Sequence, residues 1–378
     1  MWFLSRPDAS TVWKNDKIRQ HYARYRAILD GEKKARYLIV KKTTAPPFSN
    51  DTSLEELWTL HGETSESFHQ LLAEIDKNES DLQSIPTPER SFLDLKVTII
   101  QKILQSCHFC ERRCEVDRTA GELGFCRVGE ESYVASAFLH SGEESVLVPS
   151  GTIFFTGCTF TCAFCQNYDI SQEWCTSDGS KVHSGAMASP KKVALLSEKL
   201  WKDGAKNINY VGGDPTPNLH TIIKSLLHFD ANITLLWNSN MYQSKEATIL
   251  LLDLMDFWLP DFKFWDNAFA KKMSGITDYR EIITRNISMA YTEGSGEILI
   301  RHLIMPDRVE KDTFPILEWC AEHVPNALVN LMDQYHPDYL VKRDPSRFHS
   351  IKRRINPEEW RKATTKADEL GILWRPVS

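Results

Sequence analysis

A strand-like apolar run that ends in three closely spaced cysteines is the feature that most constrains this chain. The run, Gly151–Thr156, is rich in β-branched and aromatic residues, and Cys158, Cys162 and Cys165 follow it with three and two residues between them. A loop of this kind can wrap one metal cluster, since three thiolates bind three irons of a four-iron, four-sulfur (4Fe–4S) cluster and leave the fourth iron open. A zinc site usually presents two separated cysteine pairs and closes all four positions with protein ligands. The spacing therefore favours an iron–sulfur cluster over a zinc knuckle or a chance group of buried cysteines.

Composition and charge narrow the class of protein further. With 378 residues, of which 42% are hydrophobic, the chain can hold one large domain or two ordinary ones. Its formal net charge of −6 argues against a general nucleic-acid binder. It lacks the apolar run that a membrane span needs, and residues 1–4 are too few for the apolar core of a signal peptide. We therefore expect no membrane partner and a reducing cytoplasmic setting, in which nine cysteines indicate metal binding rather than disulfides.

A second group of four cysteines lies upstream of the triplet: Cys107, Cys110, Cys114 and Cys126. Gly121 and Gly124 stand between the last two and allow tight backbone turns. Four cysteines within so short a segment are typical of a metal site. Zinc would make the site a structural staple, whereas a second iron–sulfur cluster could relay electrons. Both alternatives are open at this stage, and we favour a closed structural site.

The pattern along the chain predicts four parts. Residues 1–106 have helical periodicity and carry no recognisable chemistry, so we predict a helical N-terminal extension. Residues 107–149 are predicted to form the four-cysteine module, and residues 150–345 the part that contains the cysteine triplet and the predicted strands. Residues 346–378 form a C-terminal helical segment, in which a helix over Pro357–Leu370 ends at Gly371.

From Gly151 onward, strand-like segments alternate with helix-like ones, as in parallel β/α units. The predicted strands are Gly151–Thr156, Asn207–Val211, Ile233–Trp237, Phe257–Phe262, Glu297–Ile304 and Ala327–Met332. The predicted helices between them are Pro190–Lys202, Leu219–Phe229, Lys245–Met255, Tyr279–Tyr291 and Val309–His323. The sequence thus predicts an α/β fold with a parallel sheet, curved or open, whose ligands gather at the carboxyl ends of the strands.

Polar or glycine-rich segments follow each predicted strand, which is where a ligand site would lie. After the cysteine triplet they are Gly212–Pro217, Asn238–Asn240, Asp261–Lys263, Arg301 with His302, and Asp333–His336. Asp261 and Lys263 are two residues apart, so both should face the same side of their strand. Any one of these segments is explained by turn chemistry, but their recurrence at every strand end predicts one shared site.

The triplet of Cys158, Cys162 and Cys165 matches the Cys-x3-Cys-x2-Cys motif of the radical S-adenosylmethionine (SAM) superfamily, which the chain therefore resembles. A closer likeness is to the proteins named for their similarity to pyruvate formate-lyase activating enzyme, and it covers about residues 107–340. This likeness rests on the four-cysteine segment, on Gly157–Asn167, on Gly212–Pro215 and on Pro260–Lys263.

The resemblance implies a partial (β/α)6 barrel of the radical SAM type with a 4Fe–4S cluster. A reduced cluster of this kind cleaves SAM to methionine and a 5′-deoxyadenosyl radical, which takes a hydrogen atom from a protein or small-molecule substrate. The resemblance also implies an electron donor such as flavodoxin or ferredoxin. Two alternatives stand beside this reading: an activase of a glycyl-radical enzyme, and an iron–sulfur protein that transfers electrons without catalysis.

The resemblance further implies roles for individual residues at the strand ends. Gly212, Gly213 and Asp214 look like the loop that receives the methionine amino group, and Asp214 stands where the family usually has Glu. Lys263 would pair with the methionine carboxylate, with Asp261 orienting it. The remaining candidates around the cofactor are Asn238 and Ser239 for the ribose, Phe164 beside the adenine, and Arg301, His302 and Gln334.

Overall fold

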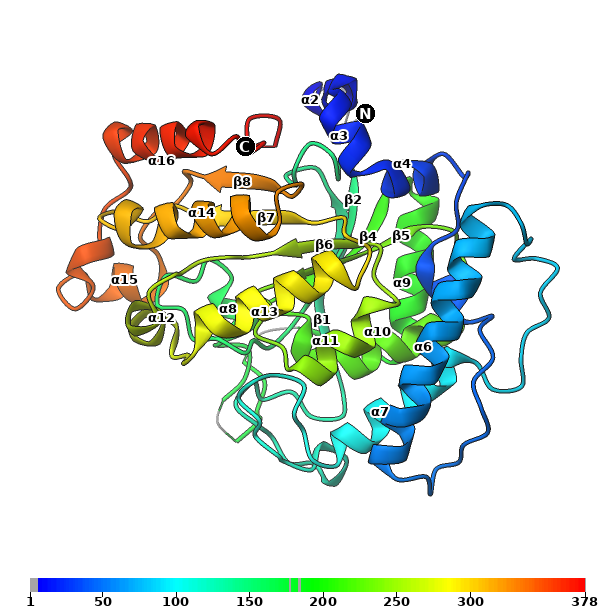
Figure 1. Ribbon diagram of the computed structural model, residues 1–378. Helices are drawn as coiled ribbons and strands as arrows, with labels where there is room; N and C mark the ends of the chain where they lie inside the picture. The colour runs from blue at the N-terminus through cyan, green and yellow to red at the C-terminus, as the bar shows by residue number, and fades with distance from the viewer. Residues whose placement is uncertain (1–5, 177, 183–184, 378) are drawn as a thin grey trace.

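The centre of the protein is a curved α/β assembly, shown in the computed structural model of Figure 1, which describes residues 6–176, 178–182 and 185–377. One sheet has the strand order β3 (Ala186–Met187), β1 (Tyr133–His140), β2 (Ser150–Phe155), β4 (Asn207–Gly212), β5 (Thr234–Ser239) and β6 (Phe257–Pro260). A second sheet pairs β7 (Leu299–Leu303) with β8 (Leu328–Met332).

The six strands predicted from the sequence are all present and follow one another in space as they do along the chain. Strands β2, β4, β5 and β6 pair in parallel, and β7 pairs with β8 in the same way. Two backbone hydrogen bonds join the sheets, from Trp258 N to Glu297 O (2.9 Å) and from Phe262 N to Arg301 O (2.8 Å). The carboxyl ends of the six strands therefore open on one side, an arrangement consistent with a radical SAM partial barrel.

The sheet is mixed rather than purely parallel, because β1 runs antiparallel along the free edge of β2. The sequence analysis missed β1 and the short β3. Only the first residues of β1 are buried, and the rest alternate between half-buried and exposed. An edge strand of this kind lacks the continuous apolar run that marks β2, which is covered on both faces.

Helices connect the parallel strands as predicted: α9 (Pro190–Lys202), α10 (Leu219–Ser225), α11 (Lys245–Leu252), α13 (Tyr279–Thr292) and α14 (Phe314–His323). The π-helical turn η5 (Val309–Thr313) leads into α14, and the 3-10 turns η3 (Thr216–Asn218) and η4 (Leu226–His228) flank α10. The bounds of α9 agree with the prediction because Ser189 caps its first turn and Pro190 stands at the first position. Helix α12 (Asn267–Ser274), which ends at Gly275, was not predicted.

Residues 6–104 contain mainly helices, as predicted, and pack onto the sheet and its helices. They form α2 (Asp8–Thr11), η1 (Val12–Lys14), α3 (Asp16–His21), α4 (Ala23–Leu29), α5 (Arg36–Val40), α6 (Leu54–Asp76) and α7 (Phe92–Leu104). Figure 1 shows α6 and α7 along one flank of the molecule, next to α10. Tyr22, which separates α3 from α4, donates a hydrogen bond from its hydroxyl to Ile298 O (2.9 Å). The N-terminal part therefore contributes to the same packed structure as the strands.

The remaining helices are short or C-terminal: η2 (Arg118–Ala120), α8 (Tyr168–Ser171), α15 (Tyr339–Arg343), η6 (His349–Ile351) and α16 (Pro357–Glu369). Asn356 caps α16 reciprocally with Glu359, and the helix packs on α14. In the part of the chain that the structure describes, no helix has both the length and the apolar character needed to cross a membrane.

Candidate functional site

A cavity of about 270 Å³ lies at the carboxyl ends of the parallel strands, where the polar segments were predicted to meet. The strands β2, β4, β5, β6, β7 and β8 each send residues to it from their last positions or from the loop that follows. The lining residues are Cys158, Phe160, Cys162, Phe164, Cys165, Gln166, Asn167, Val211, Gly212, Gly213, Asp214, Asn238, Ser239, Asn240, Asp261, Lys263, Arg301, Leu303, Met332 and Tyr335. The structure thus brings together all but two of the predicted site residues outside the four-cysteine module.

The three cysteines of the motif line this cavity from the loop after β2. Each sulfur lies near a hydrogen-bond donor. Phe160 N donates to Cys158 Sγ (3.3 Å), Ser274 Oγ donates to Cys162 Sγ (3.0 Å), and Ser171 Oγ lies 3.3 Å from Cys165 Sγ. Hydrogen bonds to sulfur stabilise the thiolate form that binds iron.

Burial raises the pKa of all three thiols, that of Cys162 to about 12. The neighbouring thiols add to the shift for Cys158 and Cys162, because each disfavours a second negative charge nearby. Such thiols hold their protons at neutral pH until a metal replaces them. Three sulfurs on one cavity wall, each with a donor beside it, fit the three protein ligands of a 4Fe–4S cluster.

Packing requires glycine at the two positions where β4 ends, Gly212 and Gly213. A Cβ atom on Gly212, whose φ is 146°, would lie 1.9 Å from Phe155 O, and one on Gly213 would lie 2.3 Å from Gly157 O. The Gly213 and Asp214 N–H groups donate to Phe155 O and Gly157 O, both at 2.9 Å. The loop after β4 therefore packs tightly against the loop that carries Cys158, Cys162 and Cys165, which we call the cluster loop. Because the N–H groups of Gly213 and Asp214 are used in this contact, the carbonyl oxygens of the loop after β4 remain to contact a cofactor.

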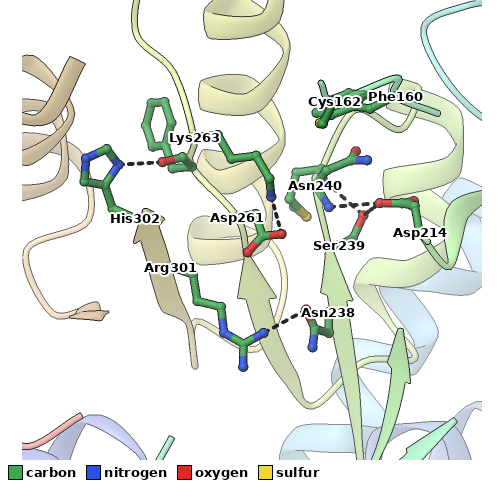
Figure 2. Close-up of polar contacts among 12 residues, drawn as sticks. Phe160, Cys162, Asp214, Asn238, Ser239, Asn240, Asp261, Lys263, Arg301 and His302 are labelled. Carbon is green, nitrogen blue, oxygen red and sulfur yellow. Dashed lines mark hydrogen bonds and ion pairs between the residues drawn. The ribbon is translucent and has the colours of Figure 1, made fainter. Parts of the chain in front are cut away.

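The Asp214 carboxylate connects the loop after β4 with the loop after β5. It accepts hydrogen bonds from Thr216 N (2.9 Å), Ser239 Oγ (3.0 Å) and Asn240 N (2.9 Å). Burial raises the pKa of Asp214, against the effect of these hydrogen bonds. The sequence analysis expected a role in receiving the amino group; the structure shows that the side chain is occupied in joining two loops (Figure 2).

Residues 238–240 lie at the end of β5 and differ in how many hydrogen-bonding groups they can offer a ligand. The Ser239 hydroxyl donates to Asp214 and accepts from Met241 N (3.1 Å), which uses most of its hydrogen-bonding capacity. The Asn238 amide reaches the cavity and accepts from the Arg301 guanidinium (3.4 Å). Asn240 lines the cavity too, with its Nδ2 3.8 Å from Cys158 Sγ.

Asp261 and Lys263 lie on the same face and form an ion pair at the end of β6, as their spacing predicted. Burial would lower the pKa of Lys263, but Asp261 and Cys162 outweigh burial and raise it. The lysine therefore stays positively charged at the cavity wall. The Tyr279 hydroxyl holds this segment in place by donating to Asp261 O (3.0 Å) and accepting from Lys263 N (2.8 Å).

Arg301 and His302 are neighbours on β7, and only Arg301 faces the cavity. His302 is 1% exposed, and its ring nitrogens lie 2.8 Å from Phe262 O and from Thr313 Oγ1, on the other side of the strand. Burial lowers the pKa of His302, so the ring is neutral. The expectation that His302 lies at the site is therefore wrong, because adjacent residues of a strand point to opposite faces.

The Arg301 guanidinium is held by two buried glutamates from the loop between β1 and β2. Its Nε and one terminal nitrogen bind both oxygens of Glu144 (2.6 and 2.7 Å), and the same terminal nitrogen pairs with Glu143. Burial would raise the pKa of Glu143, but Arg301 and His140 outweigh it and lower the pKa to about 2. The sequence gives no local signal of this contact, because the two glutamates are far along the chain from Arg301.

A larger cavity of about 960 Å³ adjoins the first, and Arg301 and Asn238 line both. Its walls come from the loop between β1 and β2, from β8, and from segments near the two ends of the described chain, including Arg6 and Arg375. Gln334, the other predicted residue outside the first cavity, lines this second one.

Several lining residues were not chosen from the sequence. Phe164 was chosen and lines the cavity edge-on to Tyr335, with ring centroids 6.1 Å apart, but Tyr335 itself was not. Gln166, Asn167 and Asn240 were seen as part of motifs without a role. The available signal was their position, since Asn240 directly follows β5 and Gln166 and Asn167 directly follow the cysteine triplet.

The four-cysteine module packs against the loops of the first cavity. The Arg112 side chain donates to Thr159 O in the cluster loop (2.6 Å), and Glu111 N donates to Tyr242 O (3.1 Å). Within residues 6–176, 178–182 and 185–377, no three His, Cys, Asp or Glu side chains are arranged to hold a single metal ion. Cysteines of a cluster bind different irons and so need not converge on one point. The second metal site therefore remains a prediction.

A model of the radical SAM superfamily matches residues 152–320, which contain the cysteine triplet and the strand ends that line the cavity. The chain belongs to the radical SAM superfamily, a superfamily of enzymes that bind SAM and a 4Fe–4S cluster. It is 40% identical over 349 residues to the uncharacterized protein MJ0674 of Methanocaldococcus jannaschii, covering 92% of this chain and 97% of that protein.

Solved structures of SuiB from Streptococcus suis are also similar, at a lower level. The structure bound to the precursor peptide SuiA and the one bound to S-adenosylmethionine are each 13% identical, with a TM-score of 0.38. Each covers 56% of this chain, which in turn spans 43% and 44% of the two SuiB chains. This similarity is too low to support an inference about the substrate.

Proposed function

We propose that this protein is a radical SAM enzyme similar to pyruvate formate-lyase activating enzyme, which cleaves SAM in the first cavity and takes a hydrogen atom from a substrate in the second. The proposal rests on one observation: three groups of residues line the same cavity. They are the three cysteines, the segment Gly212–Pro217 (the glycine loop) and the Asp261–Lys263 pair. When bound and reduced, by a donor such as flavodoxin or ferredoxin, the cluster supplies the electron that cleaves SAM to methionine and a 5′-deoxyadenosyl radical.

The chain's own residues are suited to hold the methionine part of SAM. Lys263 offers a cation to the carboxylate, and Asp261 fixes its direction. The carbonyl oxygens of the loop at Gly213 are available to accept hydrogen bonds from the amino group, since the N–H groups of Gly213 and Asp214 are used within the protein. This assigns the amino group to backbone oxygens, so the presence of Asp214 where the family usually has Glu does not prevent the contact.

The second cavity is the proposed place of the substrate. It adjoins the cofactor cavity through Arg301 and Asn238, so a substrate there lies next to the cofactor. Glu143 and Glu144 hold Arg301 in one position, and this fixes the boundary between the two cavities. A protein that only transfers electrons would need neither cavity. The activase alternative is the narrower form of this proposal, in which a peptide loop of a glycyl-radical enzyme occupies the second cavity.

The proposal is tested by SAM binding at the cluster. The protein is purified without oxygen, its cluster is reconstituted and reduced, and the EPR spectrum is recorded with and without SAM. We expect SAM to change the spectrum, because its amino and carboxylate groups bind the open iron. An unchanged spectrum, together with no heat of binding in calorimetry, would show that the cavity does not serve SAM.

A further inference from the structure

The four-cysteine module contains a buried positive charge that has no carboxylate beside it. Arg118 lies between Cys114 and Cys126 in the sequence and is 3% exposed. One terminal nitrogen donates to Pro217 O (2.7 Å), and the other lies 3.5 Å from Cys126 Sγ. Its Nε has no hydrogen-bond partner, and within the described part of the chain the guanidinium forms no ion pair with Asp or Glu.

A guanidinium in this position requires a negative charge nearby. Arginine is always protonated in proteins, and burying an uncompensated charge costs several kcal/mol even after relaxation. The groups that interact most strongly with Arg118 through charge are Cys126, Cys107 and Cys110. Neutral thiols supply no counter-charge, whereas thiolates do. Several thiolates so close together would repel one another unless a metal held them.

The backbone of the module is shaped around its sulfurs. Residues Arg113, Glu115 and Arg127 adopt positive φ angles of 42°, 57° and 60°, which non-glycine residues rarely do. Phe125 N donates to Cys114 Sγ (3.5 Å), and a Cβ atom on Gly124 would lie 3.2 Å from that sulfur. Turns that direct N–H groups toward sulfur are typical of metal–thiolate sites.

We propose that Cys107, Cys110, Cys114 and Cys126 bind a metal centre as four thiolates, and that Arg118 is the buried counter-ion of this centre. Four thiolates around Zn²⁺, or around an oxidised 4Fe–4S cluster, carry a net negative charge in either case. Binding of Zn²⁺ or of a preformed cluster releases the four thiol protons to solvent and needs no oxidant or reductant.

The position of the centre connects it with the cofactor cavity. Arg118 donates to Pro217 O in the glycine loop, Arg112 donates to Thr159 O in the cluster loop, and Glu111 N donates to Tyr242 O after β5. The four-cysteine module therefore forms hydrogen bonds with three of the loops that line the cofactor cavity. The existence of the centre does not depend on the proposed function, because its ligands are separate from the cysteine triplet.

Metal analysis of the full-length protein tests this proposal. The first cluster is removed with the triple substitution Cys158→Ala, Cys162→Ala and Cys165→Ala, and folding is checked by circular dichroism. We expect the purified triple variant to retain either about four irons with sulfide or about one zinc per chain, and the two results distinguish a cluster from a zinc site. A folded triple variant that contains neither metal would overturn the proposal.

Thiol reactivity of the unsubstituted protein gives a second test that does not depend on the folding of a variant. Cys114 is exposed, so a free thiol at this position would react at once with Ellman's reagent. We expect the holoprotein to show this thiol only after a chelator has removed the metal. Immediate reaction of Cys114, identified by mass spectrometry, would contradict the proposal.

The counter-ion role of Arg118 is tested by the rate of metal release to a chelator. We expect Arg118→Met to release the metal at least about tenfold faster and Arg118→Lys, which keeps the charge, to recover part of the difference. Arg19→Met in helix α3 is the control and should leave the release rate unchanged, since Arg19 is exposed, pairs with Asp16 and lies outside the module. Equal release rates for all three variants would show that Arg118 is not the counter-ion.

Discussion

At the scale of single residues, the account depends on contacts that leave little freedom for substitution. Asp214 joins two loops through three hydrogen bonds, and Gly213 lets the loop after β4 approach the cluster loop. Lys263 keeps its charge because Asp261 lies beside it. These residues act together on one cavity, so each substitution should change SAM binding without removing the cluster ligands.

Gly213→Ala should weaken SAM binding by at least about tenfold, which is roughly 1.4 kcal/mol. The added Cβ atom would lie 2.3 Å from Gly157 O, so the loop or the cluster loop must move. Calorimetry on the reconstituted protein measures the affinity. Gly62→Ala in helix α6 is the control, since its Cβ meets nothing within 4 Å and it should leave SAM affinity unchanged. Equal affinities in both variants would contradict the role of Gly213.

Lys263→Ala should also lower SAM affinity by about tenfold or more, because the methionine carboxylate would lose its cation. The absorption of the cluster should stay the same, since Lys263 is not one of the cysteine ligands. Lys263→Arg keeps the charge and should bind SAM better than the alanine variant. A Lys263→Ala protein with full SAM affinity would show that the carboxylate binds elsewhere.

The residue scale also shows what the sequence could and could not predict. Asp261 and Lys263 were placed correctly on one face because a strand has a period of two. By the same rule, only one of the adjacent residues Arg301 and His302 can face the cavity, but the sequence does not show which one does. The contact of Arg301 with Glu143 joins residues 158 positions apart, and no local pattern reveals such a pair.

At the scale of elements, the helices and strands between Ser150 and Met332 follow the sequence closely because their caps and apolar runs are local signals. The strand β2 is a continuous buried run, and α9 begins with a serine cap and a proline. The edge strand β1 lacks such signals, and its formation depends on pairing with a distant segment, which becomes visible only in the structure. Helix α12 does have local signals, an Asp266 cap at its start and Gly275 at its end, which the sequence analysis overlooked.

The contact between helix α7 and the end of α11 contains a buried ion pair that can be tested directly. Lys96 is fully buried and lies 2.8 Å from Asp253 Oδ2 and 2.8 Å from His61 Nε2. Lys96→Met should lower the free energy of unfolding by about 3 to 5 kcal/mol, because Asp253 would stay buried without its partner. Urea unfolding measures this change.

Lys102→Met is the control for this prediction, since Lys102 lies on the same helix but is only half-buried. It should change the free energy of unfolding by less than about 1 kcal/mol. If the two variants were equally stable, the Lys96–Asp253 pair would not be a main support of the contact between α7 and α11.

At the scale of the whole molecule, the N-terminal helices are bound to the strands rather than appended to them. Glu297 stands just before β7 and accepts hydrogen bonds from Arg24 N (2.8 Å) and Tyr25 N (2.9 Å) at the start of α4. Tyr22 and Tyr25 both contact Phe257 of β6. The sequence predicted helices here, but their place against the strands could not be predicted because it rests on these long-range contacts.

Glu297 also predicts how stability depends on pH. Burial raises its pKa from 4.5 to about 8, so the folded protein holds a proton that the unfolded chain releases above about pH 4.5. This contribution to stability is complete below pH 4.5 and is lost as the pH rises to about 8. We expect it to reduce the free energy of unfolding by about 3 to 5 kcal/mol over that range.

The Glu297→Gln variant should remove this pH dependence, since glutamine keeps the acceptor oxygen and does not titrate. Urea unfolding of both proteins between pH 5 and pH 8 provides the comparison. Parallel curves for the two proteins would mean that Glu297 is ionised in the folded state throughout this range, contrary to the prediction.

The central claim is that the first cavity holds a cluster that cleaves SAM, and one measurement tests it most directly. The anaerobic protein with a reconstituted cluster is incubated with SAM and dithionite, and 5′-deoxyadenosine and methionine are quantified by mass spectrometry. We predict equal amounts of both products from the unsubstituted protein and none from Cys158→Ala. A protein with a full cluster that forms no 5′-deoxyadenosine under these conditions would contradict the claim.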